Sequence, residues 1–318
     1  MINKEYGFQE VYLLHNKCMV ESRSQCDPSV MLGDMKFRCG VVPANMKSVV
    51  NENTCLYLAE KGWFYIMHRF GIDNCDFTKF MHEKGYFASI SIGVNDDSYD
   101  TLKLMKKDNI IPEYITLDIA NAYSIKAERM IKFIKDNFTS FLIVGNYATE
   151  EAVMALEAWG ADATKAGISN GHVCETYMST GMSRPQFSTI LECSSVAKKP
   201  IISDGAIKNV GDLSKAYVAG ASLVMCGNIF AGYDQSAGEI IEIDGKRYKQ
   251  YFGSASYNNT LSQRNVEGKC ILVEWKGDME KLLSKIEDGI RSGISYAGGF
   301  DMSAFNNVRW GVREGGVR

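Results

Sequence analysis

Residues Tyr114–Gly145 read YITLDIANAYSIKAERMIKFIKDNFTSFLIVG and decide the fold class. At the two ends of this stretch stand short runs rich in β-branched and aromatic residues, Tyr114–Asp118 and Phe141–Gly145. Between them, Ile125–Asp136 repeats apolar residues at helical spacing. A strand, a helix and a second strand in this order predict a βαβ unit with parallel strands, and therefore an α/β protein.

The same alternation continues in both directions along the chain. We expect six further strands, at Gly40–Ala44, Trp63–Met67, Phe87–Gly93, Asp162–Gly167, Pro200–Asp204 and Ser222–Gly227. Helical patterns between the strands include Glu150–Trp159 and Val210–Ala219. Eight strands of this kind favour a closed (β/α)8 barrel, although periodicity alone does not exclude an open, doubly wound sheet.

The pattern changes after the eighth expected strand. Ile240–Tyr251 alternates around an Asp-Gly pair, which predicts a β-hairpin. Asn258–Gly268 is polar and is expected to be mobile, and Met279–Ser292 predicts a closing helix. Because these segments are additions to one barrel, we expect a single domain over residues 1–318 with a C-terminal hairpin or flap.

Composition excludes several classes of partner. The chain has 318 residues, with 35 basic and 38 acidic side chains and a formal net charge of −3, so no basic surface for nucleic acid is expected. No apolar run is long enough to span a membrane. The opening residues, MINKEYGFQE, do not have the pattern of a secretory signal.

Cysteine usage indicates a reducing compartment. Nine cysteines, an odd number, are spread along the chain without a C-x-x-C pair. This argues against a disulfide framework and against a zinc ribbon, and it favours a cytoplasmic location. The chain has no H-E-x-x-H motif and no carboxylate cluster, so no transition metal is expected.

The most informative segment for chemistry is KAGISNGHVCETYMSTG, residues 165–181, which follows the sixth expected strand. In (β/α)8 barrels the active site lies at the carboxyl ends of the strands, where this segment begins. Cys174 is therefore a candidate nucleophile, since a thiolate attacks well when its surroundings favour ionisation or supply a base. The alternative is that Cys174 is one of nine ordinary thiols.

Two further motifs follow the seventh and eighth expected strands. Asp204 and Gly205 suit hydrogen bonds to sugar hydroxyls. Gly227 and Asn228 open a segment whose backbone N–H groups could bind phosphate. Each pair alone is weak evidence, because glycine after a strand is usually only a turn.

Two weaker candidates complete the set. Glu267, in NVEGK, could transfer a proton if its segment folds over the site, although an isolated glutamate is more often a solvated surface residue. His68 and Arg69 follow the second expected strand and could bind a cofactor phosphate, although such a pair is more often structural.

Taken together, the motifs resemble those of the IMP dehydrogenase/GMP reductase family, in particular its bacterial reductase branch of Gram-positive type. The resemblance covers nearly the whole chain. Besides the Cys174 segment it rests on SRSQCD (Ser22–Asp27), VVPANM (Val41–Met46), FYIMHRF (Phe64–Phe70), ASISIGV (Ala88–Val94), YITLDIAN (Tyr114–Asn121), PIISDG (Pro200–Gly205), YFGSAS (Tyr251–Ser256), NVEGK (Asn265–Lys269) and SGISYAGG (Ser292–Gly299). Several motifs in order on one chain make a specific match, whereas a single one would not.

The resemblance implies a (β/α)8 barrel, usually a homotetramer, that acts on a purine nucleoside monophosphate: GMP and NADPH give IMP, ammonia and NADP. In this chemistry the thiolate of Cys174 attacks C2 of the purine, ammonia departs to give a covalent thioimidate, and hydride transfer releases the thiol. Thr176 and Glu267 match the pair expected to protonate the leaving amine. The dehydrogenase branch carries regulatory CBS modules after the second strand, and the chain between Met67 and Phe87 is too short to hold them, which favours the reductase.

The resemblance also implies binding roles. Substrate contacts, to the ribose and the 5′-phosphate, fall on Asp204, Gly205, Gly227, Asn228, Gly253 and Ser256. Cofactor contacts fall on Ser22, Arg23, Arg69, Asp118, Ile119 and Ala120, and an arginine suits the extra phosphate of NADPH. A potassium ion would be held by backbone carbonyls in the loop that includes Ser169, Gly171 and Cys174.

The loop before the nucleophile departs from the family pattern. It reads Gly-Ile-Ser-Asn-Gly at 167–171, where the family has Gly-Ile-Gly-Pro-Gly, and Ala206 replaces a second glycine after Gly205. Three readings remain: a GMP reductase, a related reductase or deaminase of a different or modified purine nucleotide, and a non-catalytic purine-nucleotide-binding paralogue. Retention of Cys174, Thr176 and Glu267 together argues against the third.

Overall fold

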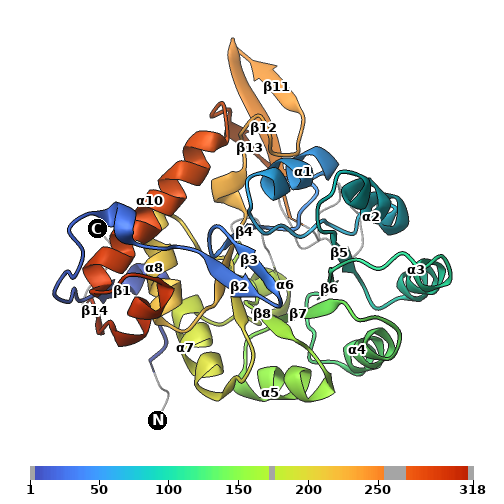
Figure 1. Cartoon of the computed structure of the whole chain (residues 1–318), viewed down its shortest axis with the longest axis horizontal. Coiled ribbons are helices and arrows are strands. Elements are labelled where there is room, and N and C mark those ends of the chain that lie inside the picture. The colour runs from blue at the N-terminus through green and yellow to red at the C-terminus, as the bar shows by residue number, and fades with distance from the viewer. Residues whose placement is uncertain (1–3, 172–175, 254–269, 314–318) are drawn as a thin grey trace.

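The structure is a computed structural model that describes residues 4–171, 176–253 and 270–313 (Figure 1). Seven parallel strands form its central sheet, in the order β4-β10-β9-β8-β7-β6-β5. Their bounds are β4 Val41–Pro43, β5 Ser89–Ile92, β6 Tyr114–Asp118, β7 Phe141–Tyr147, β8 Ala163–Ala166, β9 Ile201–Asp204 and β10 Leu223–Cys226.

Helices cover the outside of this curled sheet (Figure 1). They are α1 Glu52–Glu60, α2 Asn74–Glu83, α3 Asp96–Lys107, α4 Ile125–Asn137, α5 Glu150–Trp159, α7 Gln186–Val196, α8 Val210–Val218 and α10 Glu280–Ala297, with the short α6 Thr176–Thr180 after β8. The alternating order of strands and helices confirms the expected α/β class and the (β/α)8 type of barrel. No helix in the described ranges combines the length and apolarity needed to span a bilayer.

Capping side chains explain where several helices begin. Asn51, Asp73, Ser124 and Thr149 precede α1, α2, α4 and α5, and each accepts a backbone N–H group from the first turn of its helix. Such a cap stabilises a helix by about 1 kcal/mol, because it satisfies a donor that has no partner within the helix.

The second expected strand, at 63–67, is the one barrel strand that the structure does not contain as such. The segment is extended and fully buried, with Phe64 and Ile66 in the barrel interior and Trp63, Tyr65 and Met67 in the outer core. Its alternating burial is that of a strand. The N–H of Met67 donates to the carbonyl of Ser89 on β5 at 2.9 Å. A strand ladder requires a run of such bonds, and no strand of the described sheets pairs with 63–67 in this way.

The barrel interior is closed at the amino ends of its strands by aromatic rings. The ring of Phe64 lies 5.0 Å from those of Phe37 and Tyr114, centroid to centroid, and stacks on Phe87 at 6.1 Å. Phe37 belongs to a hairpin formed by β2 (Val30–Leu32) and β3 (Met35–Phe37). The hydroxyl of Tyr114 donates to the carbonyl of Leu32 at 2.7 Å, so this hairpin covers the amino end of the barrel and leaves the carboxyl end for function.

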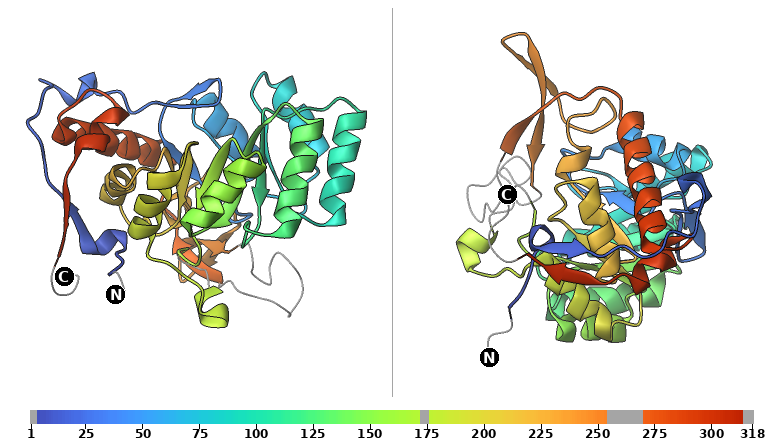
Figure 2. Two further views of the ribbon diagram at one scale, coloured as in Figure 1. Left: turned by 90° about the horizontal axis from the view of Figure 1, so that it is seen from below. Right: turned by 90° about the vertical axis from the view of Figure 1, so that its left-hand side faces the viewer.

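A small antiparallel sheet projects from the carboxyl-end side (Figure 2). It consists of β11 (Ile240–Ile243), β12 (Lys246–Phe252) and β13 (Cys270–Glu274). The expected hairpin is confirmed, with a turn at Asp244 and Gly245, both at positive φ, whereas β13 was not foreseen. Ser48 ties this sheet to the barrel, because its hydroxyl donates to the carbonyl of Phe252 at 2.8 Å and accepts the Phe252 N–H at 3.1 Å.

The expected closing helix is confirmed as α10, which continues past Ser292 to Ala297. It packs against α8 and against the 3-10 helix η2 (Arg23–Gln25). The remaining elements are η1 Phe8–Glu10, η3 Asn228–Phe230, η4 Met302–Asn307 and the pair formed by β1 Val11–Leu13 with β14 Trp310–Val312.

Truncating the aromatic cluster tests this account of the interior. Phe64→Ala is expected to lower the free energy of unfolding by about 3–5 kcal/mol, since it removes apolar contacts and leaves a cavity that fixed strands cannot close. Urea unfolding followed by circular dichroism measures the change. Ile125→Ala, at a position 68% exposed on α4, is the control and should change stability by less than about 0.5 kcal/mol. Equal losses in the two variants would contradict the interior role of Phe64.

Candidate active site

Strand pairing brings three charged side chains to the carboxyl end of the barrel. Tyr114, Ala163 and Ile202 lie in the interior cluster, and side chains two or four positions further along a strand point to the same face. Asp118, Lys165 and Asp204 therefore share the last inward layer, on β6, β8 and β9. The parallel sheet thus brings together two expected site residues, Asp118 and Asp204, with Lys165 between them.

Lys165 is the centre of this layer. Its ammonium lies 2.7 Å from Oδ2 of Asp204 and 3.1 Å from Oδ1 of Asp118, and it also donates to Oδ1 of Asn146. The side chain of Lys165 is 3% exposed, whereas those of Asp118 and Asp204 keep 15% and 20%. Burial by itself would lower the pKa of Lys165, but the carboxylates of Asp204 and Asp118 outweigh it and raise the pKa, so the ammonium stays charged.

Two glycines make room for this arrangement. A Cβ atom on Gly145, which pairs with Lys165 across β7 and β8, would lie 2.6 Å from the Lys165 Cβ. A Cβ on Gly167 would lie 2.3 Å from the backbone carbonyl of Asp204, and Gly167 has a φ of +147°. Neither position accepts a side chain without displacing the charged layer.

The expected substrate residues Asp204, Gly205, Gly227, Asn228 and Gly253 come from neighbouring chain ends. Asp204 pairs with Met225 of β10, which places Gly227 and Asn228 just beyond it, and the Gly205 N–H donates to the Met225 carbonyl at 3.3 Å. Gly253 follows β12 at the point where Ser48 holds Phe252.

Tyr251 lies against the expected phosphate side of the site. Its hydroxyl would be 2.3 Å from a Cβ at Gly227, so only glycine fits there. The ring is 2% exposed, and burial, together with the nearby Asp204 and Cys226, raises the pKa of Tyr251. The hydroxyl therefore stays protonated and can donate.

Two of the three departures from the family pattern, Asn170 and Ala206, contact each other. The N–H of Ala206 donates to the carbonyl of Asn170 at 2.9 Å, and Ala206 adopts a left-handed φ of +63°. The side-chain amide of Asn170 donates to the Arg184 carbonyl at 3.1 Å and to Oε1 of Gln186 at 2.6 Å. A proline at position 170 would lack this amide, so the asparagine supplies a connection that the family sequence does not.

The described residues on both sides of positions 172–175 make fixed contacts. Ser169, at a φ of +64°, accepts the Tyr177 N–H with its hydroxyl at 2.8 Å, which fixes the first turn of α6 and therefore Thr176. Further on, Arg184 pairs with carboxylates of Glu5, Glu150 and Glu192. Gly171, also expected near the ion, follows Asn170 at an exposed position. In the ranges that the structure describes, no group of three His, Cys, Asp or Glu side chains could hold a metal ion.

The expected cofactor residues divide into two groups. Arg69 and Asp118–Ala120 lie together, since Nε of Arg69 donates to the Asp118 carbonyl at 3.2 Å and its guanidinium stacks 4.6 Å from the Phe70 ring centroid. Ser22 and Arg23 lie elsewhere, because Ser22 caps η2 and Arg23 is its first residue, and η2 packs against α10. The left view of Figure 2 shows the segment that contains η2 and the β2–β3 hairpin on the opposite side of the barrel from α6, whereas the N-terminus lies on the side of α6.

Three expected site residues, Cys174, Ser256 and Glu267, lie outside the described residues, as does the polar segment expected at Asn258–Gly268. Conversely, Lys165 was missed as a site residue. Its signal was a lysine in an otherwise uncharged, buried strand, at a position where the alternation places the side chain inside the barrel.

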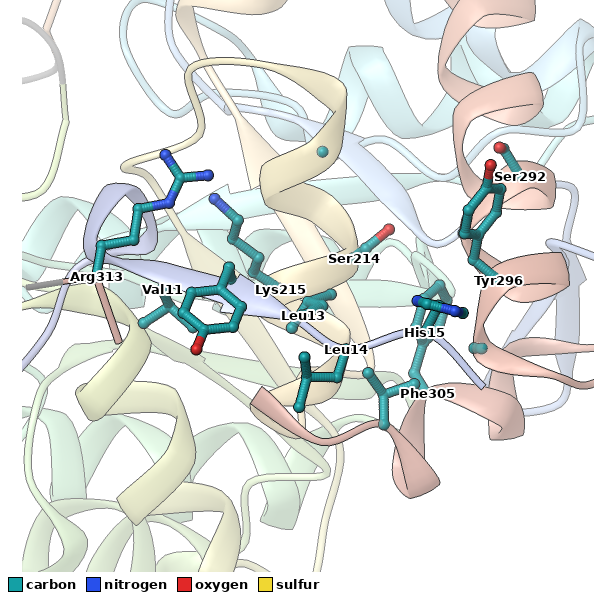
Figure 3. A pocket seen from close by; sticks show the side chains of 15 residues that line it. Val11, Leu13, Leu14, His15, Ser214, Lys215, Ser292, Tyr296, Phe305 and Arg313 are labelled. Carbon is teal, nitrogen blue, oxygen red and sulfur yellow. The ribbon is translucent and has the colours of Figure 1, made fainter. Parts of the chain in front are cut away.

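A separate pocket lies on the outer wall of the barrel, between β1, α8, α10 and η4 (Figure 3). Its volume is about 370 Å³ and its lining is mainly apolar, with Leu13 and Phe305 among the side chains. Lys215, at its edge, donates to the Phe8 carbonyl at 2.7 Å and to Oδ1 of Asp212 at 3.1 Å. Because the pocket contains none of the residues at the carboxyl ends of the strands, we do not assign the chemistry to it.

Fold and site together define a (β/α)8-barrel protein with a charged site at the carboxyl ends of its strands. The family model "IMP dehydrogenase / GMP reductase domain" matches residues 5–313. The chain belongs to the IMP dehydrogenase/GMP reductase family.

Several curated proteins named GMP reductase are similar over almost their full lengths. The protein of Chromobacterium violaceum is 53% identical over 309 residues, which cover 97% of this chain and 98% of that protein. The proteins of Clostridium acetobutylicum and Lactobacillus johnsonii are 48% and 47% identical over 307 residues each, or 95% of this chain and 94% and 93% of those proteins. The resemblance to the family seen in the sequence is confirmed.

His68 is not available for a cofactor phosphate as a cation. It is 3% exposed, and its Nδ1 accepts the Phe70 N–H at 3.2 Å. Burial, with a smaller contribution from Lys47, lowers the pKa of His68 from 6.5 to about 4. The imidazole is therefore neutral near pH 7, and Arg69 remains as the charged member of the pair.

The lowered pKa of His68 predicts a pH dependence of stability. Between pH 6.5 and about 4 the unfolded chain takes up a proton that the folded chain refuses, so this contribution is complete above pH 6.5 and is lost as the pH falls toward 4. Its size is about 3 kcal/mol, from about 1.4 kcal/mol per pKa unit. Urea unfolding from pH 7 to pH 4 should show that His68→Gln loses about that much less stability than the unmodified protein. Parallel curves for the two proteins would show that His68 titrates normally.

Proposed function

We propose that this chain reduces GMP to IMP with NADPH as the hydride donor. The observation that carries the proposal is the arrangement of residues around Lys165 at the carboxyl ends of the strands, here called the rim. Asp204, Gly205 and Gly227 lie on one side of Lys165. Asp118 and Arg69 lie on the other side. Such an arrangement suits a nucleotide and a dinucleotide that meet at their reacting ends. The similarity to proteins named GMP reductase over nearly the whole chain supports the same reaction here.

Cys174 is the proposed nucleophile. Its thiolate sulfur forms a bond to C2 of the purine, the bond from C2 to the exocyclic nitrogen breaks, and the nitrogen leaves as ammonia after it has gained a proton. C2 of the resulting thioimidate then accepts a hydride, the C2–S bond breaks, and IMP leaves with the thiolate restored. Two steps with a good leaving group at each replace one difficult displacement.

Thr176 and Glu267 are the proposed proton-transfer pair. Thr176 opens α6, whose first turn is fixed by the hydrogen bond from the Tyr177 N–H to Ser169. A hydroxyl can pass a proton from a carboxylic acid to an amine because it donates and accepts at the same oxygen. The carboxyl group of Glu267 is the proposed source of that proton.

Substrate binding is assigned to the ends of β9, β10 and β12. Asp204 accepts hydrogen bonds from the ribose hydroxyls, and the backbone N–H groups of Gly227 and Asn228 receive the phosphate, with Gly205, Gly253 and Ser256 beside them. The N–H groups of Gly205 and Ala206 already donate to the carbonyls of Met225 and Asn170, so the phosphate site proposed here relies on the groups that follow β10.

The rim also has groups that fit NADPH. Arg69 is exposed, is positioned by Asp118 and Phe70, and makes no ion pair within the described chain, so its guanidinium can receive a phosphate. Asp118, Ile119 and Ala120 form the adjoining backbone at the end of β6. NADPH, when bound, supplies the hydride that C2 accepts.

A homotetramer is part of the proposal, and the place of Ser22 and Arg23 agrees with assembly. Their segment, at η2, packs on α10 and lies on the opposite side of the barrel from α6 (Figure 2), so a second copy must supply these residues if they contact the cofactor at the carboxyl ends of the strands. We also propose a cytoplasmic location, which agrees with eight free thiols among the described residues.

The potassium site is proposed at the backbone carbonyls of the loop containing Ser169, Gly171 and Cys174. Ser169 already holds a left-handed backbone conformation, which turns successive carbonyl groups of the loop in different directions. Turnover measured in potassium and in sodium salts tests the ion requirement directly.

The decisive assay mixes the protein with GMP and NADPH and follows the loss of reduced-nicotinamide absorbance. Oxidation of NADPH is expected only when GMP is present, with IMP and ammonia formed in equal amounts. Cys174→Ala should lower the rate by about a thousandfold or more, as removal of a covalent nucleophile does. Cys18→Ala, which removes an exposed thiol elsewhere in the chain, is the matched control and should retain the full rate.

Other outcomes separate the remaining alternatives. Binding of GMP without turnover would reject GMP as the reducible substrate and favour a different or modified purine nucleotide. Failure to bind any purine monophosphate would reject the enzyme assignment and favour a paralogue with a changed pocket.

A further inference from the structure

Lys165 has no role in the reaction as proposed, yet it is the most deeply buried charge at the rim. Its three N–H groups have three acceptors, on Asp204, Asp118 and Asn146. A lysine ammonium has three donors and no acceptor, so these partners satisfy it completely. A group saturated in this way does not transfer protons to a substrate, and its function must lie in what it holds.

Lys165 determines which oxygen of Asp204 remains available. Oδ2 of Asp204 accepts two hydrogen bonds, from Lys165 Nζ at 2.7 Å and from Asn146 Nδ2 at 2.8 Å. Among the described residues no donor reaches Oδ1, although the side chain is 20% exposed. The carboxylate is thus fixed through Oδ2, and Oδ1 stays available to accept hydrogen bonds from sugar hydroxyls.

Asp118 is held from the other side of the same ammonium. Its Oδ1 accepts from Lys165 Nζ at 3.1 Å, and its backbone carbonyl receives Nε of Arg69 at 3.2 Å. Asp118 and Asp204 come from strands β6 and β9, which are separated in the sheet by β7 and β8. One cation therefore fixes the carboxylate on the substrate side and the carboxylate on the cofactor side relative to each other.

We propose that Lys165 is the positioning residue of this site, which orients Asp204 toward the ribose hydroxyls of the nucleotide and Asp118 toward the cofactor. The inference rests on the proposed function. Without the ammonium, two carboxylates at the mouth of the barrel repel each other and the incoming phosphates, and Asp204 keeps only Asn146 as its fixed partner.

The test is discrimination between two nucleotides. GMP and its 2′,3′-dideoxy analogue differ only in the hydroxyl groups that Asp204 would receive. Dissociation constants for both, measured by calorimetry without cofactor, give a ratio that reports on the orientation of Asp204. The unmodified protein is expected to bind GMP at least about tenfold more tightly, since hydrogen bonds to a charged acceptor are strong.

Lys165→Met should bring this ratio close to one, whereas Lys165→Arg, which keeps the charge, should restore a substantial part of it. Lys165→Met should also raise the KM for NADPH, through Asp118, more than it lowers the rate at saturating substrates. Lys215→Met is the matched control, because it removes a lysine that pairs with an aspartate on α8 outside the rim, and it should leave the ratio unchanged.

A general loss of packing would not produce this pattern. It would weaken the binding of both nucleotides alike and leave the ratio of their dissociation constants near that of the unmodified protein. That result in a folded Lys165→Met would overturn this inference and leave the proposed function standing. If Lys165→Met does not fold, the ratio of dissociation constants is measured with Lys165→Gln instead. A ratio close to one supports the inference, and an unchanged ratio overturns it. Failure of the unmodified protein to bind GMP would overturn the proposed function and this inference together.

Discussion

The ammonium of Lys165, buried between two carboxylates, is the constraint on which the rest of the site depends. An unpaired charge at that depth would cost several kcal/mol, so the fold must bring Asp118 and Asp204 to it from two other strands. Gly145 must remain without a side chain because the lysine lies across it. The relative positions of strands β6 to β9 at the carboxyl end are thus linked by electrostatics as well as by the backbone ladder.

The two ends of the barrel differ in polarity and in exposure to water. At the amino end, the β2–β3 hairpin and the rings of Phe37, Phe64 and Tyr114 exclude water and provide apolar burial. At the carboxyl end, the last inward layer is charged and partly exposed. Parallel strands place all their carboxyl ends on one side, so stability and chemistry occupy different ends of the same interior. This division allows the loops around Asp204 to vary without loss of the core.

Two of the departures from the family pattern, Asn170 and Ala206, lie next to each other in the structure. Asn170 and Ala206 are far apart in the sequence, yet the carbonyl of one receives the N–H of the other at 2.9 Å. The Asn170 amide then reaches Arg184 and Gln186, which lie just beyond the segment that contains the nucleophile. The backbone bond could also form with proline and glycine at these positions, whereas the two side-chain bonds of Asn170 could not, so the asparagine adds hydrogen bonds at the base of the loop. Together with Ser169 the chain departs from the family pattern at three positions, and the structure brings two of them, Asn170 and Ala206, into contact.

Local pattern in the sequence was enough to determine the class of fold, seven of the eight expected barrel strands, the hairpin at Asp244-Gly245 and the family, because periodicity, turn chemistry and ordered motifs are encoded over short stretches. Tertiary structure alone decided three matters. The segment 63–67 keeps the burial of a strand without its ladder, β13 pairs with β12 across a long connection, and Lys165 meets carboxylates 39 and 47 positions away. Each depends on hydrogen bonds or charges between residues distant in the chain, and a pairing of that kind leaves no periodic trace in the sequence that adopts it.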